Sequence, residues 1–194
     1  MTIISHEELP FLREKHKDKK IVCCTGVFDL THAGHILFFE DCKKYGDILV
    51  VLVGRDSFVK SYKGDKRPIL NEHVRLKTID SLKPVDYVLL DKREVFREGE
   101  EIEGIKSISL LLKPDFYIIN EDVSNLEKRK KAVEELGVKF IVLDRYCPKE
   151  FENISTTKII EKLQVNNETQ KPLGHRYEGC QICKSKKLHK FLTL

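Results

Sequence analysis

The sequence predicts an α/β fold: a Rossmann-like, doubly wound domain built on a five-stranded parallel sheet. Five short runs of apolar residues recur along the chain, and segments long enough to form helices separate them. Each run is almost continuously apolar, as in a strand that is covered on both faces. Strands that alternate with helices require right-handed crossovers and therefore a parallel sheet. At 194 residues and 41% hydrophobic content, the chain can bury one such core.

The elements are expected in a regular order. A short helix over residues 6–16 lies in an N-terminal extension, residues 1–19. The strands are expected over residues 20–28, 47–54, 85–90, 116–120 and 139–143, and the main helices over 33–45, 71–82, 101–112, 124–136 and 155–163. The charged segment 55–70 is read as a loop. The α/β domain therefore spans residues 20–164, and a basic tail follows over residues 165–194.

Charge and composition restrict the function classes. Six of the 35 Lys and Arg residues and two of the 31 Asp and Glu residues follow Gln164, so the net charge of +4 belongs to the tail and the body is neutral. A nucleic-acid surface on the main domain would need a concentrated basic face, so we do not expect a nucleic-acid partner. No apolar run reaches membrane-spanning length, and no signal peptide is evident, so we expect a cytoplasmic protein without a membrane partner.

Two histidines follow the first expected strand, in the stretch "TGVFDLTHAGH". His32 and His35 are three residues apart and therefore share one face of a helix. A single histidine here would be read as a polar residue that caps or solubilises a helix start. Gly34 lies between the two and leaves room for a ligand to approach the backbone, and the free amides of a helix start favour anions. Together these features predict a phosphate site at the carboxyl end of the first strand.

The stretch "GVFDLTHAGH" resembles the HxGH signature of the nucleotidyltransferase superfamily, which includes cytidylyltransferases and heptose-phosphate adenylyltransferases. Further segments in the expected order strengthen the resemblance: "VLVGRDSFVKSYKGDKRPI", Arg75 ten residues before "VDYVLL", and "ISTTKII". The resemblance covers about residues 20–163. It implies a fold of the HUP nucleotidyltransferase type and transfer of a nucleoside monophosphate from a triphosphate to a phosphorylated acceptor.

The resemblance also implies roles for individual residues. His32, His35 and Lys60 would be catalytic, with the two imidazoles donating hydrogen bonds to the α-phosphate and the departing pyrophosphate. Mg²⁺ would bind with the triphosphate, without a dedicated protein cage. The nucleotide and its phosphates would contact Thr25, Gly26, Val27, Phe28, Gly34, Asp122, Ser155, Thr156 and Thr157, with Lys158 adding charge. The acceptor would contact Asp29, Lys63, Arg67 and Arg75.

Several of these positions also have simpler readings or depart from the family pattern. Ser155 alone would satisfy a helix N-cap, and a lysine in a charged loop is usually only solvated. His73 and Val74 replace the Glu-Gln or Glu-His pair that relatives carry before the arginine. Where relatives show Gly-Gly-Asp or Gly-Asp-Asp after the fourth strand, this chain reads "NED" at 120–122. The last difference falls where the base would be recognised.

The motifs leave the two substrates open. "KGDKRPI" is closest to the heptose-phosphate adenylyltransferases, "ISTTKI" is similar to the glycerol-3-phosphate cytidylyltransferases, and "GRDSFV" resembles a segment of archaeal-type FAD synthetases. We expect a sugar- or polyol-phosphate acceptor, with ATP ahead of CTP. A catalytically silent nucleotide-binding module is the alternative from another class. Homodimers are common in the family, although no stretch of this sequence demonstrates one.

The tail contains a second cluster of chemically reactive residues. Cys180 and Cys183 have the spacing of zinc ligands, and His175 and His189 could complete a set of four. A single CxxC pair is weak evidence, and the histidine spacings match no standard zinc module. An inert basic tail is therefore favoured over a structural zinc site or a redox pair.

Overall fold

The computed structural model describes residues 3–97, 102–144, 148–151 and 154–169. By their contacts, the residues fall into two compact units, one ending at Thr156 and the other beginning at Thr157. The first unit carries the sheet and is described here first. The tail residues His175, Cys180, Cys183 and His189, whose spacing was weighed as a zinc site against the favoured inert tail, lie outside the described part of the chain.

The first unit is built on a five-stranded parallel sheet, as predicted. Its strand order is β3-β2-β1-β4-β5, which is the order of a doubly wound fold. The strands are β1 (Ile21–Gly26), β2 (Ile48–Val53), β3 (Tyr87–Leu90), β4 (Phe116–Asn120) and β5 (Lys139–Leu143). Every strand lies within a predicted apolar run, and β4 and β5 match their predicted ranges. The fold class predicted from the sequence is confirmed.

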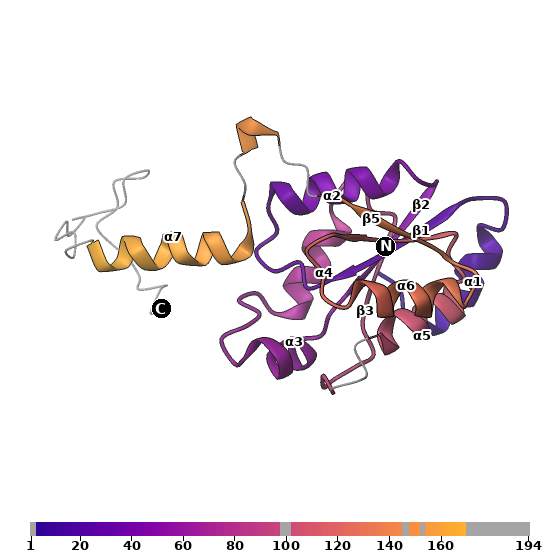
Figure 1. Ribbon diagram of the computed structural model, residues 1–194, viewed down its shortest axis with the longest axis horizontal. Coiled ribbons are helices and arrows are strands. Elements are labelled where there is room, and N and C mark those ends of the chain that lie inside the picture. The colour runs from indigo at the N-terminus through magenta and orange to yellow at the C-terminus, as the bar shows by residue number, and fades with distance from the viewer. Residues whose placement is uncertain (1–2, 98–101, 145–147, 152–153, 170–194) are drawn as a thin grey trace, which may run out of the picture. The chain divides into compact units, whose positions relative to one another are not determined.

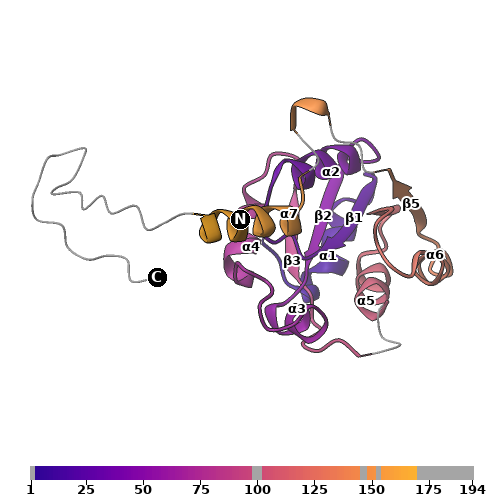
Figure 2. The same cartoon turned by 60° about the vertical axis from the view of Figure 1, so that its left-hand side comes forward.

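Helices cover both faces of the sheet (Figures 1 and 2). On one face α2 (Ala33–Lys43) and α4 (Glu72–Asp80) pack on strand residues such as Val22 and Val51. On the other face α5 (Glu103–Leu112) and α6 (Leu126–Glu134) lie side by side and pack on residues such as Cys23 and Val50. Side chains of successive strand residues therefore pack into the cores on opposite faces of the sheet, which explains the continuous apolar runs in the sequence.

The N-terminal extension is part of this unit. A 3₁₀ turn, η1 (His6–Glu8), leads into α1 (Leu9–Lys15), whose Leu9 and Leu12 are buried in the core beside α5. Just before the turn, the Ile4 amide donates a 2.9 Å hydrogen bond to the Val88 carbonyl of β3. The extension is thus fixed to the sheet by both backbone and side-chain contacts.

The segment after β2 corrects the sequence analysis, which read residues 55–70 as a loop. The structure has a helix here, α3 (Asp56–Lys63), and it ends at Gly64, whose φ of 86° stops the helix. Phe58 and Val59 are buried on its inner side. Lys60 and Lys63 therefore project from a helix of defined orientation rather than from a mobile charged loop.

The second unit contains most of α7 (Thr156–Thr169), which begins one residue after the predicted start. A further 3₁₀ turn, η2 (Lys149–Phe151), precedes it. Among the described residues, no helix combines the length and the apolar character that a membrane crossing requires.

Candidate active site

The candidate site lies at the carboxyl ends of the parallel strands. The strand order reverses at β1, which has β2 on one side and β4 on the other. Ligands of doubly wound folds bind beyond the strand ends at such a point. The chain leaves β1 at Gly26 and turns through residues 27–32 into α2, so the histidine stretch borders this position.

His32 and His35 form a stacked pair at the start of α2. Their ring centroids are 4.0 Å apart with an angle of 25° between the planes. His32 is the N-cap residue with extended backbone, and it is buried. His35 meets the ring of Phe28 edge-on, with 5.5 Å between centroids. The predicted spacing therefore does bring both imidazoles to one place beside the free amides of the helix start.

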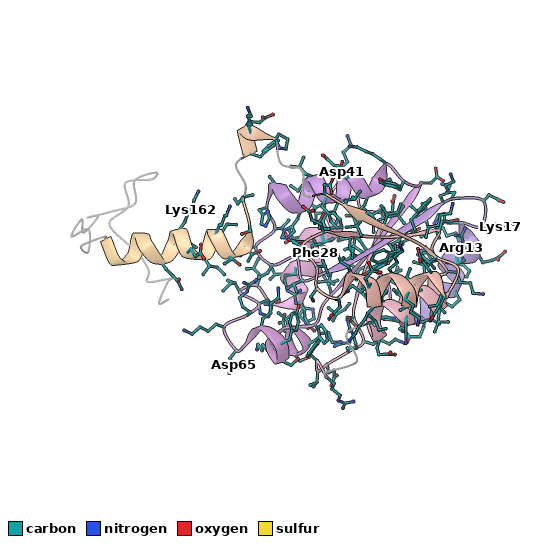
Figure 3. All side chains as sticks on the ribbon, in the orientation of Figure 1. Arg13, Lys17, Phe28, Asp41, Asp65 and Lys162 are labelled. Carbon is teal, nitrogen blue, oxygen red and sulfur yellow. The ribbon has the colours of Figure 1, made fainter. Side chains whose placement is uncertain are left out.

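Phe28 occupies an unusual backbone conformation, with a φ of 52°. Its ring lies against Gly26, where an added Cβ would approach Phe28 Cζ to 2.6 Å. Gly26 is therefore needed for this close approach. Figure 3 shows Phe28 within the body of the unit, where it also packs on Phe39 with 4.9 Å between centroids. The contacts of Phe28 with Gly26 and Phe39 therefore fix the turn that carries the histidines.

A segment far along the chain joins the histidine stretch. The Thr156 hydroxyl donates a 2.8 Å hydrogen bond to the Asp29 carbonyl. A Cβ added at Gly34 would lie 3.1 Å from His32 Nδ1 and 3.6 Å from the Ile154 carbonyl oxygen. Residues 154–156 thus lie against the start of α2. Ser155 belongs to this segment, whereas Thr157 and Lys158 fall in the second unit, where both are exposed.

Three of the four predicted acceptor-binding residues, Asp29, Arg67 and Arg75, make contacts inside the protein. The Asp29 contacts join it to the segment after α3. Its carboxylate is buried and accepts hydrogen bonds from the amides of Ile69 at 2.8 Å and Leu70 at 2.9 Å. Arg67 Nε donates to the same carboxylate at 3.1 Å. Asp29 therefore holds the segment between α3 and α4 in place, and we no longer assign it to the acceptor.

Arg75, another predicted acceptor-binding residue, is fully buried. Its guanidinium donates to the carbonyls of Val27 and Gly54, each at 2.7 Å, and to that of Leu70 at 3.0 Å. It also donates to Asp56 Oδ1 at 2.6 Å. Four of its five donors are used, so Arg75 joins the ends of β1 and β2 to α3 and α4 instead of reaching an acceptor.

Lys63 interacts electrostatically with three charged residues, Arg67, Asp29 and Asp122. Although the residue is exposed, crowding of its ammonium by protein atoms lowers its pKa, and Arg67 lowers it further. The carboxylates of Asp29 and Asp122 raise the pKa of Lys63. Asp122 follows β4, so a carboxylate from the end of β4 interacts electrostatically with Lys63 of α3. Lys60, also exposed, lies one turn earlier on α3.

Hydrogen bonds join the end of β1 to β4 and to the end of β2. The Thr25 hydroxyl and the Tyr117 hydroxyl lie 2.6 Å apart, and burial raises the pKa of Tyr117, which keeps its proton. The Gly26 carbonyl accepts from the Gly54 amide at 2.9 Å. The predicted nucleotide-binding residues 25–28 are therefore rigidly placed, although their side chains and carbonyls are largely engaged within the protein.

The structure adds an aromatic face that the sequence analysis missed. Phe58, Tyr62 and Phe96 contact one another with 5.2–6.0 Å between ring centroids. The Arg93 guanidinium lies 4.2 Å from the centroid of the Phe58 ring, and the Phe96 amide donates to Ser61 Oγ at 2.7 Å. Tyr62 is 42% exposed. Phe58 and Tyr62 are four residues apart on α3, which was the one sequence signal, whereas Phe96 lies far along the chain.

Comparison with known proteins identifies the family. Residues 23–162 match the family model described as cytidylyltransferase-like. The chain belongs to the cytidylyltransferase-like family. This range contains the stacked histidines, α3 and residues 154–156, and the predicted membership of the nucleotidyltransferase superfamily is confirmed.

Individual members of the family resemble the chain over most of its length. It is 39% identical to Bifunctional protein HldE of Helicobacter pylori (strain G27) over 151 residues, which are 77% of this chain and 29% of that protein. It is 35% identical to FAD synthase of Ferroglobus placidus over 147 residues, 75% of this chain and 88% of that protein. The chain thus spans less than a third of the HldE proteins and most of the FAD synthases.

Solved structures agree with this placement. The lipopolysaccharide core biosynthesis protein from Thermoplasma volcanium has a TM-score of 0.50 at 32% identity, over 65% of this chain and 95% of that one. Pantothenate synthetase from Thermus thermophilus has a TM-score of 0.57 at 15% identity, over 87% of this chain and 70% of that one. The second likeness is one of fold alone.

Proposed function

We propose that the protein transfers an adenylyl group from ATP to a phosphorylated small-molecule acceptor and releases pyrophosphate. The observation that carries the proposal is the stacked pair His32 and His35 at the start of α2, with residues 154–156 against the same helix start. Donors from distant parts of the chain thereby surround one position, as a triphosphate requires. Membership of the cytidylyltransferase-like family supports the reaction class.

The chemistry is direct displacement at the α-phosphorus. The acceptor phosphate oxygen attacks, a new P–O bond forms, and the bond to the pyrophosphate oxygen breaks. The imidazoles and the α2 amides would donate hydrogen bonds to the phosphate oxygens as charge builds on them. Lys60 and Lys63 on α3 would hold the attacking phosphate, so positioning supplies much of the rate gain.

A divalent cation fits this site through the substrate. Among the described residues, no group of three or more His, Cys, Asp or Glu side chains is arranged to hold a metal ion. Mg²⁺ commonly binds through phosphate oxygens and water with one or two protein carboxylates. When bound with the triphosphate it would neutralise phosphate charge, while the chain's own residues bind and orient the reactants.

The acceptor is the less determined substrate. The motifs favour a sugar or polyol phosphate, and the likeness to HldE supports that class. Tyr62 and Phe96, the accessible part of the aromatic face, favour a second class, a phosphate monoester that carries a flat ring, as a flavin does. An aromatic surface stacks well on a flat ring but leaves many sugar hydroxyls without partners. The likeness to FAD synthase supports this candidate.

A triphosphate-by-acceptor screen tests the proposal. Pyrophosphate release would be measured with ATP and CTP against sugar phosphates, glycerol 3-phosphate and flavin mononucleotide. We expect turnover with ATP and one acceptor class. If triphosphate binds without turnover for every acceptor tried, the silent nucleotide-binding module replaces the enzyme.

The aromatic face offers a sharper test of the second candidate. Tyr62→Ala and Phe96→Ala should each raise KM for flavin mononucleotide about tenfold, because a lost stacking contact of about 1–3 kcal/mol weakens binding by that order. KM for ATP should not change. Phe11→Ala is the matched control, because Phe11 is 72% exposed on α1. Unchanged acceptor KM in both variants would remove the aromatic face from the site.

A further inference from the structure

The strongest unassigned feature is a cavity at the edge of the sheet opposite the candidate active site. It encloses about 380 Å³ and is lined at the amino ends of three strands, by Lys20 before β1, Phe116 of β4 and Lys139 of β5. The end of α5 and the turn after α6 complete its walls. Figure 3 shows Arg13, whose partner Asp115 lines this cavity, far from Asp65 at the α3 end of the unit. The cavity lies at the amino ends of the strands and the histidines follow the carboxyl end of β1, so the two sites are separate.

The cavity has an excess of positive charge. Lys20, Lys113 and Lys139 line it, and all three are exposed. The carboxylate in the lining, Asp115, is already neutralised: its Oδ2 accepts from Arg13 at 3.0 Å and from the Ile21 amide at 2.8 Å. An anion in the cavity would meet three ammonium groups and no competing free carboxylate among the lining residues.

Lys113 stands where a lysine is unfavourable for the backbone. It follows the last residue of α5 in the left-handed conformation, with φ of 47° and ψ of 59°. Glycine or asparagine is usual at this position because a Cβ is strained there. Side chains held at such strained positions often have a functional reason. Lys113 lines the cavity at a position where glycine would be less strained.

Apolar groups beside the cations define the rest of the ligand. Leu110 is 56% exposed although it is a large aliphatic side chain, and Phe116 is half-buried. Both line the cavity together with Leu136 and Val138. A purely inorganic anion would leave this surface uncovered. The ligand therefore needs a charged head and a short hydrocarbon or ring body.

We propose that this cavity binds a small phosphate monoester with an apolar body, at a site distinct from the active site. The ammonium groups of Lys20, Lys113 and Lys139 hold the dianionic head. Leu110 and Phe116 cover the body. The volume suits one small molecule, and the binding needs no nucleotide.

Titration calorimetry with n-hexyl phosphate tests the proposal on the full chain saturated with Mg²⁺ and ATP. Lys113→Gly removes one ammonium and relieves the backbone strain, so it should weaken this binding at least tenfold while raising the melting temperature. Lys139→Ala, which removes a second ammonium of the lining, should also weaken it. Lys63→Ala, which alters the active-site cation, is the control that should leave this binding unchanged.

Ligand comparison separates the head from the body. Inorganic phosphate and 1-hexanol should each bind more weakly than n-hexyl phosphate, because each offers half of the contacts. Equal affinity in the unaltered protein and in a folded Lys113→Gly variant would overturn the proposal. So would the absence of saturable binding by the unaltered protein, or loss of all binding in Lys63→Ala.

Discussion

Arg75 shows how single buried charges set the shape of the candidate site. Its guanidinium bonds to Val27 after β1, Gly54 after β2 and Asp56 on α3. Asp29 plays the matching role for Arg67 and the amides of Ile69 and Leu70. Both residues position the loops that carry other site groups, and neither has to touch substrate to matter.

Removing Arg75 should therefore act on stability. Arg75→Met keeps much of the volume but leaves Asp56 and three carbonyls without their donor, and we expect a loss of about 3–5 kcal/mol. Chemical unfolding monitored by circular dichroism measures it. Lys77→Ala on the same helix is the control, because Lys77 is exposed and its pair with Asp80 contributes little. A loss below about 1 kcal/mol in the Met variant would contradict the anchoring role.

His35 should behave in the opposite way. Its ring stacks on His32 and meets Phe28 at the helix start. His35→Ala should lower the rate of pyrophosphate release about 10²- to 10³-fold, the usual loss for one donor to transition-state charge. The unfolding free energy should change little, because the residue is only half-buried. His73→Ala, on the exposed side of α4, should keep full activity. A normal rate in His35→Ala would exclude the catalytic role.

At the scale of elements, the sequence predicts the sheet well and α3 poorly. The inner strands β1, β2 and β4 are buried on both faces, so their apolar runs are visible without any tertiary information, and even the partly exposed edge strand β5 keeps such a run. In α3 most residues are polar, and the helix depends on Phe58 and Val59 packing against the rest of the fold. That burial is a tertiary property, which the local composition concealed.

Of the candidate site, the sequence predicted the histidine pair but not the internal contacts around it. The histidine spacing placed two imidazoles together because i and i+3 share a helix face. The internal roles of Asp29 and Arg75 were not visible, since a charged residue in a motif reads as a ligand group until its partners are known. The aromatic face needed α3 and the segment after β3 side by side, and neither pattern alone predicts it.

The N-terminal extension carries a pH-sensitive contact of its own. His6 in η1 is buried, and its Nε2 lies 2.9 Å from the Leu90 carbonyl at the end of β3. Burial lowers the pKa of His6 below its ordinary 6.5, and Lys92 lowers it further, while the Leu90 hydrogen bond, Asp91 and Glu7 raise it. The net shift is downward, so the folded state resists protonation here.

This shift has a definite sign for stability. Below about pH 6.5 the unfolded chain binds a proton at His6 more readily than the folded chain, so acidification favours unfolding. Stability should therefore fall from about pH 7.5 to about pH 5.5, and His6→Gln should reduce that fall. Urea unfolding at both pH values measures it. An identical fall in the variant would assign the effect to other groups, such as His16, whose pKa burial also lowers.

At the scale of the whole molecule, the candidate site joins parts of the chain that are far apart in sequence. Residues 25–35 meet residues 154–156 through Gly34 and the bond from Thr156 to Asp29, and Asp122 after β4 acts on Lys63 of α3. The site is therefore complete only when the full parallel sheet has formed. A ligand that contacts all these segments must stabilise the fold as a unit.

The size of that stabilisation can be stated. At a concentration about one hundred times its Kd, a ligand that binds only the folded state contributes about 2.7 kcal/mol. For a chain of this length that corresponds to a rise in melting temperature of about 5–11 °C. We expect this rise with ATP and Mg²⁺ in a thermal unfolding experiment, and a smaller one with CTP at equal concentration. A larger shift with CTP would make the protein a cytidylyltransferase, and no shift with either would argue against a triphosphate site.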